Sequence, residues 1–201
     1  MVADGIYYAL GLTLGGFLIA YLTRPAYGIP LFILAVFCLY FFRDPERPIP
    51  VGPYAVSPAD GKVLVVTAED GGTRISIFLN VFDVHVNRSP VPGTITSVKY
   101  QPGKFLVASR EEASKENEMN TVAVEGEGSK VVFKQITGLI ARRIVFWKKV
   151  GDVVNRGERV GMIKFGSRMD VWLGPEWEIA VQVGQRVSAG SSILAKKKGA
   201  T

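Results

Sequence analysis

Apolar residues are concentrated at the start of the chain, in two runs that no charged residue interrupts. The first run, Ile6–Thr23, has 18 residues (6 to 23), close to the lower limit for a helix that spans a bilayer. The second run, Ile29–Phe42, has 14 residues (29 to 42) and would have to cross a thinned bilayer or dip into it and return. A compact segment, Arg24–Gly28, separates them. The pattern predicts a transmembrane helical hairpin, with a buried helical pair of a soluble fold as the alternative.

After the second run the pattern changes to short stretches rich in Val and Ile, bounded by Gly, Pro, Asp or Asn. Such stretches are typical of strands in a sandwich or barrel. We expect a mainly β fold with a minor α component, in which 109–120 is the one plausible soluble helix. The expected organisation is a membrane anchor (1–43), a charged, proline-rich linker (44–52) and a β domain (53–201). The expected strands are 62–67, 74–79, 93–100, 121–124, 130–136, 142–147, 160–165, 170–173 and 179–183.

A short internal repeat lies in the second half of the β domain. The pattern Val-Gly-x-x-Val-x-x-Gly occurs at 150–157 and again at 183–190, 33 residues later. It is typical of biotinyl/lipoyl hammerhead folds, and two copies are too few for a solenoid. We therefore expect a hammerhead-like unit with two pseudo-symmetric halves. A biotin or lipoyl carrier would need a lysine at the tip between the halves, and the absence of lysine from Arg168 to Val183 argues against that class.

Composition narrows the chemistry further. The single cysteine, Cys38, and the single histidine, His85, exclude an intrachain disulfide and a zinc site built from several histidines, so we expect no metal. The net charge of +6 suits an anionic partner, and the apolar start favours a membrane over nucleic acid. Arg142 and Arg143 are candidate contacts for substrate or membrane, with a plain solvated surface as the alternative.

Three segments of the β domain carry reactive side chains. They supply an aspartate (Asp60), the histidine (His85) and a serine that follows a glycine (Gly166-Ser167). An acid, a histidine and a hydroxyl are the groups that a base-activated nucleophile requires. Each segment alone would be read as an ordinary turn or strand.

Together these segments resemble the signature of phosphatidylserine decarboxylases, in particular their short prokaryotic class. Larger members have Leu-Gly-Ser-Thr at the cleavage site, whereas this chain has Phe-Gly-Ser-Arg at 165–168, which resembles the Gly-Ser-Arg of short members. The residue after the serine therefore differs in its supporting role. The resemblance covers nearly the whole chain and rests on 57–63, 83–91 and 164–171, strengthened by 41–45, 138–144 and 158–163.

The resemblance implies a proenzyme that cuts itself between Gly166 and Ser167. His85, oriented by Asp60, would take the proton of Ser167, whose oxygen attacks the Gly166 carbonyl. The resulting ester would eliminate and hydrolyse to leave a pyruvoyl group at residue 167. That group would form a Schiff base with phosphatidylserine and act as the electron sink for loss of CO2, giving phosphatidylethanolamine. His85 would position the carboxylate or reprotonate the product.

The implied partners are the phospholipid bilayer and the two cleaved chains, 1–166 and 167–201, which would form a heterodimer. Pairing of these into a homodimer is a further expectation from the resemblance, and nucleic acid is not an expected partner. The expected location is the cell membrane, with the β domain on the cytoplasmic side. Two alternatives stay open. One is a decarboxylase of another serine-headed lipid, such as archaetidylserine, and the other is a membrane-anchored, non-enzymatic adaptor with a lipoyl-like unit.

Overall fold

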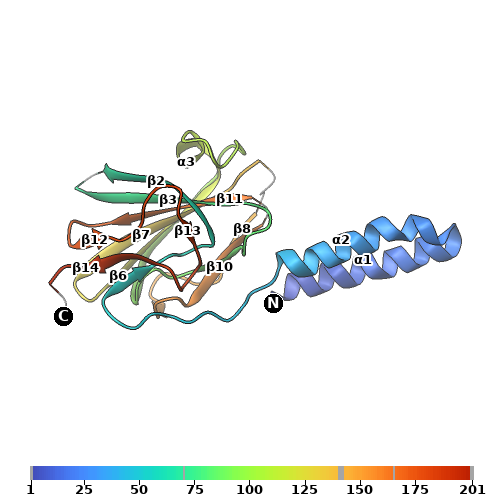
Figure 1. The fold of residues 1–201 in the computed structure, drawn as a ribbon, viewed down its shortest axis with the longest axis horizontal. Helices are drawn as coiled ribbons and strands as arrows, with labels where there is room; N and C mark the ends of the chain where they lie inside the picture. The colour runs from blue at the N-terminus through green and yellow to red at the C-terminus, as the bar shows by residue number, and fades with distance from the viewer. Residues whose placement is uncertain (1, 70, 140–142, 165, 200–201) are drawn as a thin grey trace. The chain divides into compact units, whose positions relative to one another are not determined.

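A computed structural model describes residues 2–69, 71–139, 143–164 and 166–199 of the 201-residue chain. The chain divides into two compact units, Met1–Glu46 and Arg47–Thr201. The first unit is a pair of helices and the second is built almost entirely of strands, as Figure 1 shows. The mainly β fold predicted from the sequence is confirmed.

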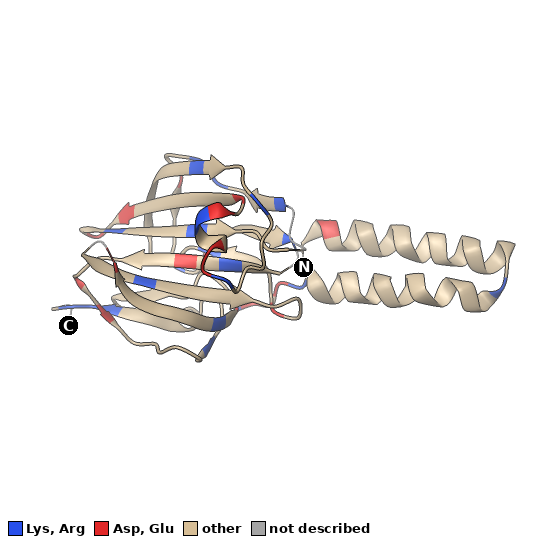
Figure 2. Cartoon of the chain, turned by 90° about the horizontal axis from the view of Figure 1, so that it is seen from above, with Lys and Arg blue, Asp and Glu red and all other residues tan. Residues whose placement is uncertain are grey.

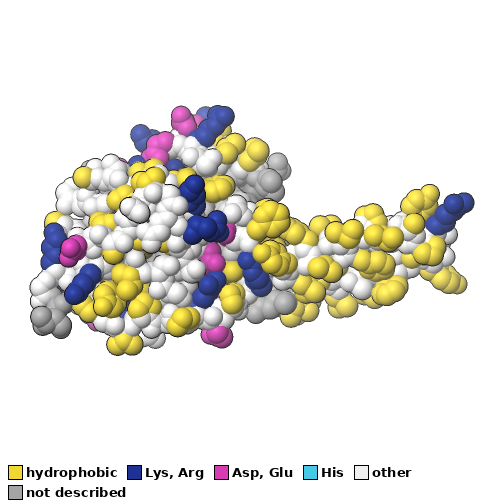
Figure 3. All heavy atoms as spheres, in the orientation of Figure 1, with side chains coloured by type: hydrophobic (Ala, Val, Ile, Leu, Met, Phe, Trp, Pro, Cys, Tyr) yellow, Lys and Arg dark blue, Asp and Glu magenta, His cyan; other side chains and the backbone are white. Residues whose placement is uncertain are grey.

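Two apolar helices, α1 (Ala3–Leu22) and α2 (Pro25–Phe41), make up the first unit. By length and composition, α1 is the one described helix that could cross a membrane, since α2 has only 17 residues. Figure 3 shows apolar side chains over the visible face of the pair. Charged residues lie at its ends, Asp4 in the first turn of α1 and Arg24 between the helices (Figure 2). Spanning by both helices stays a prediction.

Small residues allow the two helices to approach closely. A Cβ atom added to Gly28 of α2 would lie 2.6 Å from the carbonyl oxygen of Gly16 in α1. The Val2 N–H before α1 donates to the carbonyl of Phe42, which follows α2, so the helices run antiparallel. Close approach at small residues is the packing that apolar helices use in lipid, where van der Waals contact replaces the hydrophobic effect.

The described strands of the second unit form three sheets. The largest has eight strands in the order β13-β2-β3-β11-β7-β6-β5-β9, with every neighbouring pair antiparallel. The two smaller sheets have the orders β1-β14-β12 and β4-β10-β8. Figure 1 shows the long strands of the large sheet running side by side. The strands are β1 (Tyr54–Val56), β2 (Gly61–Glu69), β3 (Gly72–Leu79), β4 (Val86–Arg88), β5 (Gly93–Gln101), β6 (Met119–Gly126), β7 (Ser129–Ile136), β8 (Arg143–Phe146), β9 (Val153–Val154), β10 (Arg159–Lys164), β11 (Ser167–Leu173), β12 (Trp177–Ile179), β13 (Arg186–Val187) and β14 (Ile193–Lys197).

The prediction of a helix over 109–120 is wrong for most of that range. Only α3 (Ala113–Glu116) is helical, and Met119 already begins β6. The segment has no apolar stripe to bury, so tertiary packing does not stabilise a longer helix. Instead, the side chain of Asn117 bonds to the main chain of Leu106 and to the Thr137 carbonyl, which holds the segment as a folded loop.

Strand β11 is an inner strand of the large sheet, and its first residue is Ser167 of the candidate site. Its residues pair with β3 from Ser167 to Leu173, and with β7 from Arg168 to Trp172. Because side chains alternate along a strand, Met169 enters the main apolar core, while Arg168 and the fully buried Asp170 lie on the opposite face. The strand therefore separates an apolar layer from a buried ionic layer.

The internal repeat has a structural counterpart. The four repeat glycines, at 151, 157, 184 and 190, all have φ between 72° and 93°, the left-handed region that glycine tolerates. The first copy contributes β9 and the second contributes β13, the two edge strands of the large sheet.

The two copies also make equivalent contacts with two Ser-Pro segments. The N–H of Gly157 donates to the Ser89 carbonyl, and the N–H of Gly190 donates to the Ser57 carbonyl, each at 2.8 Å. The Ser-Pro segments bond to each other reciprocally, since Val56 donates to the Pro90 carbonyl and Arg88 to the Pro58 carbonyl, each at 2.9 Å. This reciprocity indicates pseudo-symmetric halves, and the hammerhead assignment stays a prediction.

Candidate active site

Ser167 is the first residue of β11 and is fully buried. Its backbone is opposite Leu79 of β3, so the sheet fixes its position. Its Oγ atom is buried and has no hydrogen-bond partner among the described residues. Leaving a buried hydroxyl unpaired costs about 1–3 kcal/mol, and such atoms are few in folded proteins. An unpaired hydroxyl at this position is therefore available for chemistry.

Gly166 connects the unpaired serine to a histidine. Its φ is +57°, a conformation that favours glycine. Its N–H donates to Nε2 of His85, with 3.3 Å between the nitrogen atoms. The histidine thus contacts the peptide unit that immediately precedes the Gly166–Ser167 bond.

The contacts of His85 define which of its ring nitrogens carries the proton. The ring is fully buried, and Nδ1 lies 2.9 Å from the main-chain carbonyl oxygen of Asp83. A carbonyl only accepts, so we assign the proton to Nδ1, which leaves the Nε2 lone pair to accept from Gly166. In this assignment Nε2 of His85 faces the Gly166 N–H and Nδ1 faces the Asp83 carbonyl.

A tight turn holds the carbonyl that orients His85. The N–H of Asp83 donates to the Asn80 carbonyl, and the Asp83 carboxylate accepts from the N–H of Asn80 at 2.9 Å. The other carboxylate oxygen pairs with Arg186 of β13. Asp83 was not singled out from the sequence, and its place within the histidine segment was the only signal for it.

Asp60 makes two contacts away from the His85 ring. Its Oδ2 atom pairs with Arg47 at 2.8 Å, and its Oδ1 atom accepts the N–H of Ala189 at 2.8 Å. Nδ1 of His85 faces the main-chain carbonyl of Asp83. A direct role of Asp60 in orienting His85 therefore stays a prediction.

Gly138 lies against the carbonyl of Gly166. A Cβ atom added to Gly138 would fall far inside contact distance of that carbonyl oxygen and 3.0 Å from the Cβ of Ala108. Only glycine leaves room for the carbonyl in this arrangement. The sequence placed Gly138 in a segment that resembles the family, but its contact with the Gly166 carbonyl follows only from the structure.

The residue after the serine, Arg168, is fully buried and held on several sides. Its Nε atom pairs with Asp170 at 2.6 Å, and its Nη2 atom bonds to Ser76 at 2.8 Å and to Glu111 at 2.9 Å. Arg74 also pairs with Glu111, at 2.6 Å. Because Arg168 has several partners for its donors, its burial beside the reactive serine is tolerated.

The charge of Glu111 is stabilised by this cluster. Partial burial alone would raise its pKa, but hydrogen bonds from Arg168 and Arg74, together with their positive charges, outweigh burial and lower the pKa. Glu111 is therefore ionised at neutral pH. It lies 57 residues from Arg168 in the chain and in a polar segment, so no spacing in the sequence indicated the pair.

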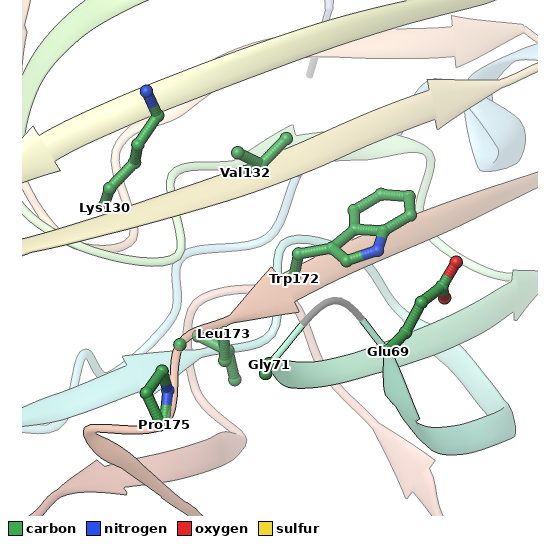
Figure 4. A pocket seen from close by; sticks show the side chains of 9 residues that line it. Glu69, Gly71, Lys130, Val132, Trp172, Leu173 and Pro175 are labelled. Atoms are coloured by element: carbon green, nitrogen blue, oxygen red, sulfur yellow. The ribbon is translucent and has the colours of Figure 1, made fainter.

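An apolar pocket of about 250 Å³ opens beside Gly166. A second pocket, of about 290 Å³, is lined by Trp172 near the other end of β11, together with Glu69 and Val132 (Figure 4). The first pocket is lined by Gly166, which precedes Ser167, and the second is not, so the first is the candidate substrate site. Its lining residues are Phe78, Asn80, Val81, Val107, Ala108, Leu139 and Gly166.

The basic pair proposed for substrate or membrane contact is described only in part. Arg143 is exposed and begins β8, opposite Lys164 of β10. Arg142 lies outside the described residues. A contact of either residue with lipid stays a prediction.

The described residues define a mainly β protein in which a buried serine, without a hydrogen-bond partner among them, begins an inner strand and follows a glycine that bonds to a histidine. The sequence pattern of the phosphatidylserine decarboxylase family matches residues 34–195. The chain therefore belongs to this family of carboxy-lyases, and the resemblance seen in the three segments is confirmed.

Individual relatives agree over almost the whole chain. A phosphatidylserine decarboxylase proenzyme of Solibacter usitatus (strain Ellin6076) is 65% identical over 197 residues, which cover 98% of this chain and 97% of the relative. Proenzymes of the same name from Cupriavidus pinatubonensis and Cupriavidus taiwanensis are 46% and 45% identical over 195 residues, covering 90% of each chain.

Proposed function

We propose that this protein decarboxylates phosphatidylserine to phosphatidylethanolamine and CO2, using a pyruvoyl group that it makes from Ser167. The observation that carries the proposal is the buried Oγ of Ser167, which has no hydrogen-bond partner among the described residues. The residue before it, Gly166, donates its N–H to His85. The names of the relatives support the substrate, and the word proenzyme in those names supports maturation by cleavage.

In the first stage, Ser167 Oγ bonds to the carbonyl carbon of Gly166 while its proton passes to Nε2 of His85. The C–N bond between Gly166 and Ser167 breaks, the amine takes up a proton, and an ester remains. A base then removes the α-proton of residue 167, and Gly166 leaves as a carboxylate with the bonding electrons. The dehydroalanine tautomerises to an imine, which takes up water and releases ammonia to leave a ketone.

The residues present fit a pyruvoyl group at position 167. A ketone carries no hydroxyl donor, so conversion removes the buried O–H of Ser167, which has no partner among the described residues. The apolar pocket is lined by the preceding residue, Gly166. The group supplies a carbonyl that reacts with the substrate amine and accepts the electrons released when CO2 leaves.

His85 is the proposed base of the first stage and the proposed proton carrier of the second. Its Nε2 lone pair faces the cleavage site, and the Asp83 carbonyl keeps the ring in that tautomer. An imidazole with an unperturbed pKa of about 6.5 can accept and return a proton near neutral pH. We retain Asp60 as the proposed acidic residue, acting in a positioning role through Ala189 and Arg47.

The protein is proposed to act at the cell membrane, with the β unit on the cytoplasmic side and the apolar helices as anchor. Cleavage would give chains 1–166 and 167–201, held together as a heterodimer because β11 of the small chain pairs with β3 and β7 of the large one. Pairing of two such heterodimers is a further proposal. The non-enzymatic adaptor is set aside, since the family is enzymatic.

Intact-mass measurement of the purified protein tests the proposal. We expect a small chain of 35 residues (201 − 167 + 1) that begins with a pyruvoyl group and resists Edman degradation. Borohydride should reduce that group and abolish decarboxylation of phosphatidylserine. Assaying archaetidylserine in parallel distinguishes the alternative substrate. An active protein whose small chain begins with a free serine would overturn the proposal.

Ser167→Ala should remain one inactive chain, because it has no oxygen to attack Gly166. Ser191→Ala is the matched control, since the Oγ of Ser191 is also buried without a partner among the described residues. That variant should be cut and active as in the wild type.

A further inference from the structure

The pocket beside Gly166 is small for the substrate of this family. Its volume of about 250 Å³ lies just below the range of about 300–1,000 Å³ that encloses most of a drug-sized ligand. A phospholipid with two acyl tails is much larger than such a ligand. The pocket can therefore hold the part of the lipid next to the reacting serine head group, while the tails stay outside it.

Exposed apolar residues line this pocket or adjoin its lining in the chain. Two of its lining residues, Val107 and Leu139, are 40% and 60% exposed. Phe82, 63% exposed, follows the lining residue Val81 in the turn that ends at Asp83. We call these three residues, Val107, Leu139 and Phe82, the rim. They belong to three separate segments of the chain, each of which contributes a residue to the pocket lining, so the fold brings these segments together.

Hydrogen bonds and an ion pair hold two of the three rim segments, those of Phe82 and Val107. The turn that carries Phe82 is held by the hydrogen bonds between Asn80 and Asp83. The segment that carries Val107 is fixed by the bonds of Asn117 to Leu106 at one end and by the pairing of Glu111 with Arg168 at the other. Apolar groups that a rigid scaffold presents to solvent around a binding pocket mark an interaction surface.

We infer that the rim contacts the hydrocarbon of the bilayer, so that the lipid is decarboxylated while its tails remain in the membrane. The inference rests on Ser167 as the reacting residue, as proposed above. A bilayer fits this surface better than a second copy of the chain does, because a protein partner over the rim would close the route by which lipid reaches the pocket. It follows that the enzyme distinguishes head groups but not tail lengths.

The test compares one set of variants on two forms of the same substrate. Full-length protein carrying Phe82→Ser, Val107→Ser and Leu139→Ser together is assayed after its cleavage has been verified by mass. One substrate is long-chain phosphatidylserine in phosphatidylcholine vesicles, and the other is dihexanoyl phosphatidylserine dissolved as monomers. We expect the loss on vesicles to exceed the loss on the monomeric lipid by about tenfold or more. Val107 and Leu139 also line the pocket, so some loss on both substrates is expected, and the difference between the two losses is the readout.

The matched control is the double variant Val153→Ser and Val183→Ser. These residues are 73% and 60% exposed, lie in the two repeat copies and are not among the pocket-lining residues. The control should keep wild-type activity on both substrates. Comparable losses for rim and control variants on vesicles would overturn the inference, because the effect would then belong to surface hydrophobicity in general.

A second measurement reports contact directly. Leu139→Trp and Val153→Trp proteins are reconstituted into vesicles that contain brominated phosphatidylcholine, and the change in fluorescence relative to the wild type is recorded. Quenching of the tryptophan at 139 but not at 153 is expected. Equal loss of activity on both substrates, or no quenching at 139, would overturn the inference. A shift from dimer to monomer with losses on both substrates would assign the rim to a second copy instead. Failure of Ser167 to mature would abolish wild-type activity on both substrates and is therefore distinguishable.

Discussion

Glu111 Oε2 lies 2.9 Å from Nη2 of Arg168, the residue that follows the reactive serine in β11. This bond joins the strand of Ser167 to the segment that also supplies Val107 and Ala108 to the pocket wall. The site and its pocket are therefore fixed to each other by an ion pair between residues far apart in the chain.

Replacing Glu111 by Gln should loosen this connection. Arg168 keeps Asp170 as a partner, and the Glu111 side chain is 46% exposed, so the free energy of unfolding should fall by only about 1 kcal/mol or less. Self-cleavage should slow several-fold and KM for phosphatidylserine should rise. Time courses on gels and steady-state kinetics measure both effects. Glu116→Gln, which removes the exposed pair with Lys104 on the same segment, should change neither.

The same pair should make stability depend on pH. The pKa of Glu111 is lower in the folded protein than in the unfolded chain, so its contribution is complete above the ordinary glutamate pKa of about 4.3. That contribution is lost as pH falls through the lowered value. Thermal unfolding of Ser167→Ala proteins with and without Glu111→Gln should differ at pH 7 and converge at acidic pH. A constant difference down to pH 3 would contradict the assignment.

Gly138→Ala should block or strongly slow self-cleavage. The added methyl group would collide with the Gly166 carbonyl oxygen and displace the peptide that Ser167 must attack, so we expect the cut fraction to rise at least tenfold more slowly. The same change made in a Ser167→Ala background separates this effect from stability, because neither protein of that pair is cut. Similar melting temperatures there, with slow cleavage in the Ser167 protein, are the expected combination. Normal cleavage would show that the carbonyl does not need this position.

His85→Ala should impair self-cleavage more strongly than Asp60→Asn does. His85→Ala removes the basic nitrogen beside Gly166 and should leave an uncut chain. Asp60→Asn keeps an acceptor for Ala189 and leaves the Asp83 carbonyl on Nδ1, so cleavage should slow but continue. Arg47→Gln, which breaks the Asp60 ion pair from the other side, is the control. An uncut Asp60→Asn protein beside a normally cut Arg47→Gln protein would show that Asp60 acts on His85 directly.

The apolar helices should hold the protein in membranes. Full-length protein should sediment with the membrane fraction and need detergent for release, because α1 is long and apolar enough to span. A chain that begins at Arg47, the first residue of the second compact unit, should be soluble. Recovery of full-length protein in the soluble fraction without detergent would contradict the anchor.

The sequence was most informative where the pattern is local. Uncharged apolar runs and Val-rich alternation predicted the apolar helices and the mainly β unit, and the segments around His85 and Ser167 pointed to the family. The contacts of Arg168 with Glu111 could not be predicted, because Glu111 lies in a polar loop whose composition had suggested a helix. The contact of Gly138 with the Gly166 carbonyl could not be predicted either. It depends on a close approach of two backbone segments, and the only trace of it in the sequence is the glycine itself.

The position of β11 between β3 and β7 has a consequence for how the protein refolds before and after cleavage. While the chain is uncut, β11 pairs with β3 and β7 of the same polypeptide, and folding is independent of concentration. After cleavage of the 166–167 bond, a denatured sample contains two separate polypeptides, and the shorter one must reach β3 and β7 of the longer one by diffusion. Refolding of the mature protein should therefore become bimolecular and inefficient when dilute, whereas Ser167→Ala protein refolds at any dilution. Cleavage would thus place a reactive chain end inside the sheet and would also make refolding after denaturation inefficient.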